Sequence, residues 1–252
     1  MQNCDAIGRM LRVSFEQANT FMLDHLRLRH PRYSVVALVL IALTCSVAAG
    51  QDSDRVDGAQ NTNDSDRALH TGANEFGVWG GLSFHASTLI GGTPDARFVN
   101  LAFRYGRVLA ANNKLAFEWT IDVEPVAVLS LKRLTFTQTA PGSFAVTTKR
   151  ERTYATGASP IGLKFNMRPQ RRVQPFANTS GGFLYFRKDV PVPGAARFNF
   201  TFDFGGGVQI INGSRHALMV GYKFQHISNG GASRINTGID VHVVYAGFSI
   251  FR

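Results

Sequence analysis

The chain has 252 residues, of which 17% are charged, and it contains 25 glycines and 20 phenylalanines. Low charge combined with many aromatic and glycine residues is typical of a membrane β-protein rather than a soluble enzyme. The net charge is +10, but the sequence shows no recognition helix and no basic run with interleaved aromatic residues, so nucleic acid is not an expected partner. Anionic lipid headgroups are the better candidate, because basic residues near a membrane surface attract them.

Residues 1–49 are expected to form a secretory signal peptide with a long leader. An apolar stretch at 35–47 follows Arg27, Arg29 and Arg32 and ends in small residues. A basic region, a short apolar core and small residues at the end are the pattern of a cleaved signal. A transmembrane anchor is the alternative, but the apolar stretch is shorter than the ~20 residues that a helical span needs.

The segment 50–74 is polar and lacks periodicity, so we expect a flexible periplasmic lead-in. Both cysteines of the chain, Cys4 and Cys45, precede it. The mature protein would then have no cysteine, which excludes a disulfide framework, a thiolate nucleophile and a cysteine-ligated metal.

From Glu75 onward, apolar residues alternate with polar or small ones, and this period of two predicts β-strands. Short turns are expected near 110–113, 168–172 and 212–213. We expect 127–149 to be a longer loop, which could instead extend its flanking strands as a hairpin. The predicted strands cover about 75–84, 97–109, 114–126, 150–168, 173–187, 197–211, 216–228 and 239–251.

Strands joined alternately by short turns and longer loops predict an all-β fold, an eight-stranded antiparallel transmembrane β-barrel over residues 75–252. The apolar faces would contact lipid, and small and polar side chains would fill the lumen. A soluble ligand-binding barrel is the alternative, but its narrow lumen would have to hold the many phenylalanines. The expected signal peptide and the aromatic C-terminal strand favour the outer membrane.

The stretch His226-Ile227-Ser228-Asn229-Gly230-Gly231 ends the seventh predicted strand. His226 and Ser228 are two residues apart, so they share one face of the strand, which by parity is the lipid face. Polar side chains in hydrocarbon are costly unless paired, and they are candidates for function. A serine nucleophile needs an adjacent base, and the base needs an orienting carboxylate. Asp240, on the adjacent last strand, can supply it.

Two other interpretations of these residues remain open. His226, Ser228 and Asp240 could be polar rim residues without a catalytic role. Alternatively, His226 and Asp240 could bind a metal together with His242.

This stretch, with Asn236-Thr237-Gly238 and the final strand, resembles the lipid A 3-O-deacylases, PagL-type outer-membrane barrels also called acyloxyacyl hydrolases. The resemblance covers about 75–251 and is specific over about 222–248. It implies a serine esterase that removes the 3-O-linked acyl chain of lipid A through a triad on the lipid-facing outer rim.

The resemblance also implies roles for individual residues. His226 would be the base, Ser228 the nucleophile and Asp240 the acid, where the family has a glutamate. Asn236 matches the family's oxyanion asparagine. The loop amides of Asn229, Gly230 and Gly231 could add further donors for the oxyanion.

The expected partner is lipid A or lipopolysaccharide in the outer leaflet, and we expect neither a cofactor nor a metal. The oligomeric state stays open, a homodimer included. The alternative function is a non-enzymatic small barrel for adhesion or envelope stability. The two functions differ at Ser228, because only the enzyme requires its hydroxyl.

Overall fold

The computed structural model describes residues 68–140, 143–213 and 215–252. The expected signal peptide and most of the expected lead-in lie outside these residues, so those boundaries stay predictions. Among the described residues, no helix is long and apolar enough to span a membrane.

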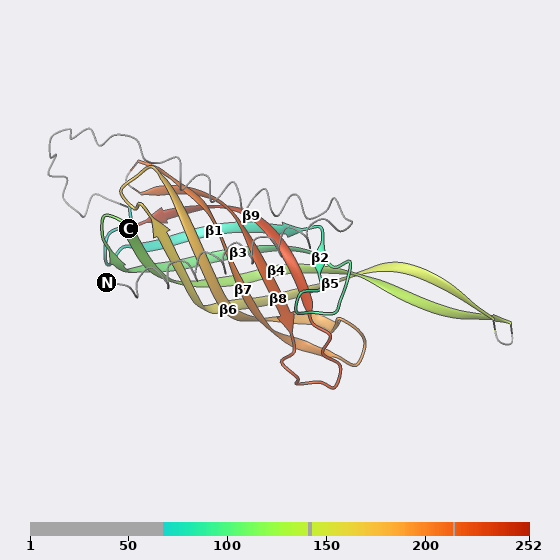
Figure 1. The fold of residues 1–252 in the computed structure, drawn as a ribbon. Helices are drawn as coiled ribbons and strands as arrows, with labels where there is room; N and C mark the ends of the chain where they lie inside the picture. Colours follow the sequence, from blue (N-terminus) through green and yellow to red (C-terminus); the bar gives the residue numbers. More distant parts are fainter. Residues whose placement is uncertain (1–67, 141–142, 214) are drawn as a thin grey trace, which may run out of the picture. The chain divides into compact units, whose positions relative to one another are not determined.

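The described chain forms a single antiparallel sheet that closes on itself (Figure 1). Each long strand pairs with the next along the chain, and β1 pairs with β9 to complete the ring. The structure therefore confirms the predicted eight-stranded antiparallel β-barrel. A short additional strand, β2, pairs with the start of β9 beyond the end of β1. The strands are β1 (Asn74–Ser83), β2 (Ala86–Ser87), β3 (Arg97–Ala111), β4 (Leu115–Ala140), β5 (Ser143–Met167), β6 (Val173–Val190), β7 (Ala196–Asn212), β8 (His216–Ser228) and β9 (Ile239–Phe251).

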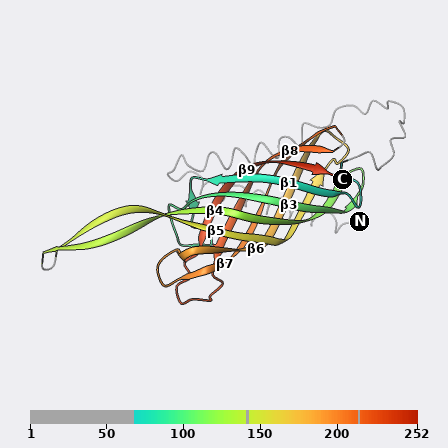
Figure 2. The same ribbon diagram turned by 180° about the vertical axis from the view of Figure 1, so that it is seen from behind.

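β4 and β5 continue beyond the barrel as a two-stranded ribbon, which Figure 2 shows projecting past the other strands. We expected a loop over 127–149, with a hairpin as the variant, and the structure has the hairpin. Its pairing continues without a large loop as far as Ala140 opposite Ser143. The reason is local, because β-branched and aromatic residues favour strands, and Phe136 pairs with Val146 in the middle of the ribbon.

The alternation of side chains sorts the barrel into two faces, as β7 illustrates. Phe198, Phe200, Phe202 and Phe204 are 41–52% exposed. The residues between them, Asn199, Thr201 and Asp203, are buried in the lumen. The apolar face thus points outward toward lipid, as the sequence pattern predicts.

The middle of the lumen is ionic. Lys164 Nζ is fully buried between Glu75 and Glu118, at 3.0 and 3.4 Å from their carboxylate oxygens. Arg104 makes two hydrogen bonds of 2.8 Å to the carboxylate of Asp122. A buried charge is tolerated only when it is paired and hydrogen-bonded, so these side chains fix one another across the barrel.

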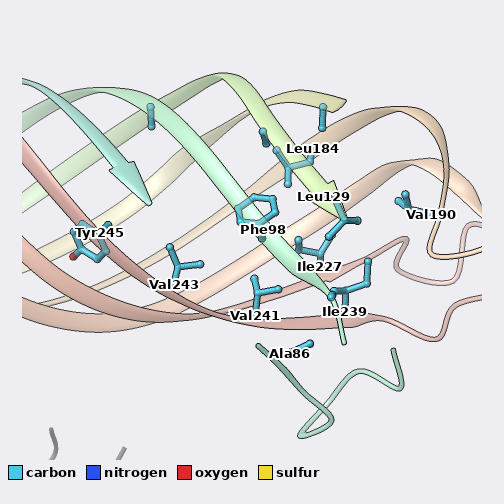
Figure 3. Packing of buried hydrophobic residues seen from close by; sticks show 14 of the residues in the cluster. Ala86, Phe98, Leu129, Leu184, Val190, Ile227, Ile239, Val241, Val243 and Tyr245 are labelled. Atoms are coloured by element: carbon cyan, nitrogen blue, oxygen red, sulfur yellow. The ribbon is translucent and has the colours of Figure 1, made fainter. Parts of the chain in front are cut away.

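Apolar clusters pack inside the lumen on either side of this ionic layer, where we expected only small and polar residues. One contains Phe98, Leu129, Leu184, Ile227 and Ile239 (Figure 3). The other joins Val108, Ala217 and Phe251 to the residues that precede β1, Ala68, Leu69 and Ala73. Both clusters contact the ionic layer, because Lys164 Nζ lies 5.6 Å from the ring centroid of Phe176 in the first cluster and 5.9 Å from that of Phe251 in the second.

The two ends of the barrel differ in their connections. At one end, which we call the short-turn end, lie the brief turns between β3 and β4, β5 and β6, and β7 and β8. At the other, the long-loop end, lie residues 84–96, 191–195 and 229–238 and the β4–β5 ribbon. In bacterial barrels the short turns face the periplasm, so we expect the long-loop end at the cell surface.

Substitution of Lys164 by methionine tests the ionic layer. It would leave Glu75 and Glu118 without their shared cation, and removal of one partner from a buried ion pair typically costs about 3–5 kcal/mol. We expect the free energy of unfolding to fall by about this amount in urea titrations of the protein in lipid vesicles. Lys149→Met, on the exposed ribbon, is the control. Equal stability of the two variants would contradict this role for Lys164.

Candidate active site

The structure brings His226 and Asp240 of the expected triad into contact at the long-loop end of the outer face, and Ser228 lies on the same face of β8 without a hydrogen bond to His226. His226 on β8 lies directly opposite Asp240 on β9 in the strand register. The Nδ1 atom of His226 is 2.7 Å from Asp240 Oδ1. The side chain of Asp240 is fully buried, whereas that of His226 is 18% exposed. The carboxylate therefore binds one ring nitrogen and leaves Nε2 without a hydrogen-bond partner among the described residues.

The other oxygen of Asp240 is held by the loop between β1 and β3. The amides of Ile90 and Gly91 donate hydrogen bonds of 2.7 and 2.9 Å to Oδ2. Donors to both oxygens stabilise the ionised carboxylate and fix its orientation. Residue types in the sequence do not predict this contact, although the Gly91-Gly92 pair is an indication of a close backbone approach.

Two glycines make this packing possible. A Cβ atom at Gly91 would lie 2.7 Å from the carbonyl carbon of Gly238, and one at Gly238 would lie 2.9 Å from Cε1 of His226. Gly238 also has a φ of +61°, which favours glycine. The β1–β3 loop, the start of β9 and the imidazole are therefore in direct contact, and a side chain at either glycine would separate them.

Ser228 follows His226 by two residues on the same face of β8, and it is half-buried. Within the described part of the chain its hydroxyl makes no hydrogen bond, so it is free to bond to a reacting group. In register on β7, Phe202 lies opposite His226 and Phe200 opposite Ser228. Both phenylalanines are about half exposed on the lipid face, which sets the polar pair beside a surface suited to acyl chains.

The loop 229–238 is organised by Asn229, which is buried. Its side chain donates to the Ile235 carbonyl (2.8 Å) and accepts from the Gly231 amide (3.0 Å). Its own amide donates to Asn236 Oδ1 at 3.1 Å. The Asn229 and Gly231 amides are thus used inside the loop. The Nδ2 group of Asn236 has no partner among the described residues and remains available as a donor.

The geometry does not favour the metal alternative. The described residues contain no group of three histidine, cysteine, aspartate or glutamate side chains that could hold a metal ion. His242 instead stacks on Tyr222 and lies 2.5 Å from its hydroxyl through Nδ1.

A comparison with known protein families matches residues 99–249 to the family described as lipid A 3-O-deacylase (PagL). The chain belongs to the PagL family. The match includes β8, the loop 229–238 and Asp240, and it confirms the resemblance that the sequence suggested. It also agrees with the predicted location in the outer membrane.

Solved structures similar to this PagL-family chain include outer-membrane proteins. The outer membrane enzyme PagL is 13% identical, with a TM-score of 0.44, and the match covers 68% of this chain and 97% of that one. Neisserial surface protein A is 16% identical (TM-score 0.42; 71% and 98% covered). OprG from Pseudomonas aeruginosa is 8% identical (TM-score 0.41; 74% and 99% covered). No curated protein matches.

The variant Gly91→Ala tests whether the β1–β3 loop positions Asp240. The added Cβ should push the loop away from Gly238 and remove both amide donors from the carboxylate. Misplacement by about 1 Å can cost about 100-fold in rate, so we expect lipid A deacylation to slow by about 10- to 100-fold in mass-spectrometric time courses. Gly181→Ala on β6, where a Cβ meets nothing within 4 Å, should retain the full rate. Full activity of Gly91→Ala would exclude the positioning role.

Proposed function

We propose that this PagL-family chain is an outer-membrane serine esterase that removes the 3-O-linked acyl chain of lipid A. Ser228 is the nucleophile, His226 the general base and Asp240 the acid that orients it. The observation that carries the proposal is the 2.7 Å hydrogen bond between His226 and the fully buried Asp240. Ser228 follows His226 by two residues, and its hydroxyl has no hydrogen-bond partner among the described residues.

The proposed reaction begins with proton transfer from Ser228 to His226. The imidazole donates its Nδ1 proton to Asp240, so the Nε2 atom is the basic one. As Nε2 takes the serine proton, Ser228 Oγ attacks the ester carbonyl carbon and forms a tetrahedral intermediate. The intermediate collapses, the 3-hydroxyl of the sugar leaves with the proton from His226, and the acyl chain stays on the serine. Water, activated by the same base, then releases the fatty acid.

The oxyanion of the intermediate needs hydrogen-bond donors that are already oriented. We assign this role first to Asn236, because the Asn229 amide fixes its Oδ1 atom and leaves the Nδ2 group as a donor. The Gly230 amide is the second candidate. Asn229 and Gly231 contribute by holding the loop, since their own amides donate within it.

The position of the triad suits a membrane-embedded substrate. The catalytic side chains lie on the outward face, beside Phe200 and Phe202, at the end expected at the cell surface. Lipid A in the outer leaflet would place its sugar near the loops and its acyl chains along the phenylalanines. The substrate would thus approach from the side of the barrel.

The proposed chemistry uses only side chains and amides of one chain. A homodimer stays a prediction.

Mass spectrometry of lipid A from cells that express the protein tests this function. Wild type should release one hydroxyacyl chain from position 3, and Ser228→Ala should release none. Asp240→Asn should slow the reaction by about 10⁴-fold, the effect of the equivalent change in a well-studied triad. Ser233→Ala, in the same loop but outside the triad, should stay within a few-fold of wild type.

Two results would contradict the proposal. Unchanged lipid A in cells where wild type is folded in the outer membrane would favour the non-enzymatic barrel. Equal activity of Ser228→Ala and wild type would remove Ser228 from the mechanism.

A further inference from the structure

The short-turn end of the barrel carries a group of exposed cations. Six of them come from the three short turns and the last residue of the sequence, and Arg107 comes from β3 near that end; we call them the cationic ring. All of its members are exposed. The ring consists of Arg107, Lys114, Arg168, Arg171, Arg172, Arg215 and Arg252.

No carboxylate side chain of the described residues faces this ring. Six of them are buried in the barrel or the active site, namely Glu75, Glu118, Asp122, Glu124, Asp203 and Asp240. The other three lie at the long-loop end and pair with cations there. Asp95 binds Lys132, Glu151 binds Arg133 and Lys188, and Asp189 binds Arg197. Among the described residues, no carboxylate side chain therefore balances the positive charge at the short-turn end.

Three cations of the ring lie next to the lipid-facing ends of strands, at the expected level of the lipid headgroups. Lys114 directly precedes Leu115, which is 48% exposed on the lipid face, and Arg172 directly precedes Val173, which is 51% exposed. Arg168 follows the lipid-facing Met167. Basic side chains just beyond the apolar band of a membrane protein meet the phosphates of the adjacent leaflet.

We propose that the cationic ring binds the headgroups of anionic phospholipids, such as phosphatidylglycerol, in the leaflet that faces the periplasm. The arrangement favours lipid over a protein partner, because the cations are distributed around the barrel instead of forming one patch. Guanidinium groups bind phosphate oxygens through two parallel hydrogen bonds. The inference is independent of the proposed esterase function, since it concerns the opposite end of the molecule and none of its residues belongs to the triad.

The two tryptophans of the chain allow a direct test. Trp119 points toward lipid and pairs in register with Arg107 beside the ring. Trp79 is buried in the lumen, 2% exposed, and provides a nearly constant background. We would reconstitute the full chain in phosphatidylcholine vesicles doped with brominated phosphatidylglycerol or brominated phosphatidylcholine. Quenching of Trp119 then reports which lipid is enriched next to the ring.

We expect stronger quenching by the brominated phosphatidylglycerol at low salt and loss of this preference at high salt, where exposed charges are screened. The variant Arg168→Gln/Arg171→Gln/Arg172→Gln should lower the preference by about tenfold or more, since each basic residue near an anionic surface contributes about fivefold. The matched control, Arg97→Gln/Arg187→Gln/Arg234→Gln, removes the same charge from the long-loop end and should keep the preference.

Three outcomes would overturn the proposal. Wild type could show no preference for the anionic lipid, which would leave an acidic protein as the occupant of the ring. The ring variant could behave as wild type does. The control could lower the preference as much as the ring variant, which would make net charge, not the ring, the cause. The variant Ser228→Ala, measured in the same quenching experiment, should show the lipid preference of wild type. The outcome of this test therefore does not depend on whether the protein is an esterase.

Discussion

The pairing of β1 with β9 is the contact on which the rest of the structure depends. Hydrocarbon offers no partner to an unpaired strand edge, so a membrane sheet must close. Once the sheet is closed, each side chain points either to lipid or to the lumen. This assignment sets the phenylalanines of β7 outside and the ions around Lys164 inside. It also brings the acid at the start of β9 against the histidine near the end of β8, because these two strands pair in register.

The same constraint explains which parts of the fold the sequence predicts. β8 and β9 have the predicted bounds, because the Asn212-Gly213 turn and the glycine-rich 229–238 loop mark where these strands begin and end. The β4–β5 ribbon was harder to predict, since it has no barrel behind it and its apolar residues cover no core. The apolar clusters in the lumen were missed because Val241 and Val243 point inward from a strand that is apolar on both faces.

In the active site, spacing and parity were sufficient to predict that His226 and Asp240 lie near each other and that Ser228 shares the histidine's face. Spacing and parity did not predict that the loop with Ile90 and Gly91 would hold Asp240. Ile90 and Gly91 act through backbone amides, which every residue except proline carries, so residue type gives little indication of their role. Their contact with Asp240 spans most of the chain and exists only because the barrel closes. The hydrogen bonds by which Asn229 orders the 229–238 loop were also not predictable, because they depend on a loop conformation that the motif does not specify.

The packed lumen has a consequence for the cell that makes this protein. Ions fill the middle of the barrel, and apolar side chains pack on both sides of them. The interior of an eight-stranded barrel is just wide enough for side chains to fill, and the proposed site lies on the outside wall. Many copies could therefore be inserted without making the envelope more permeable to small solutes. In a porin, by contrast, each added copy is also an added channel.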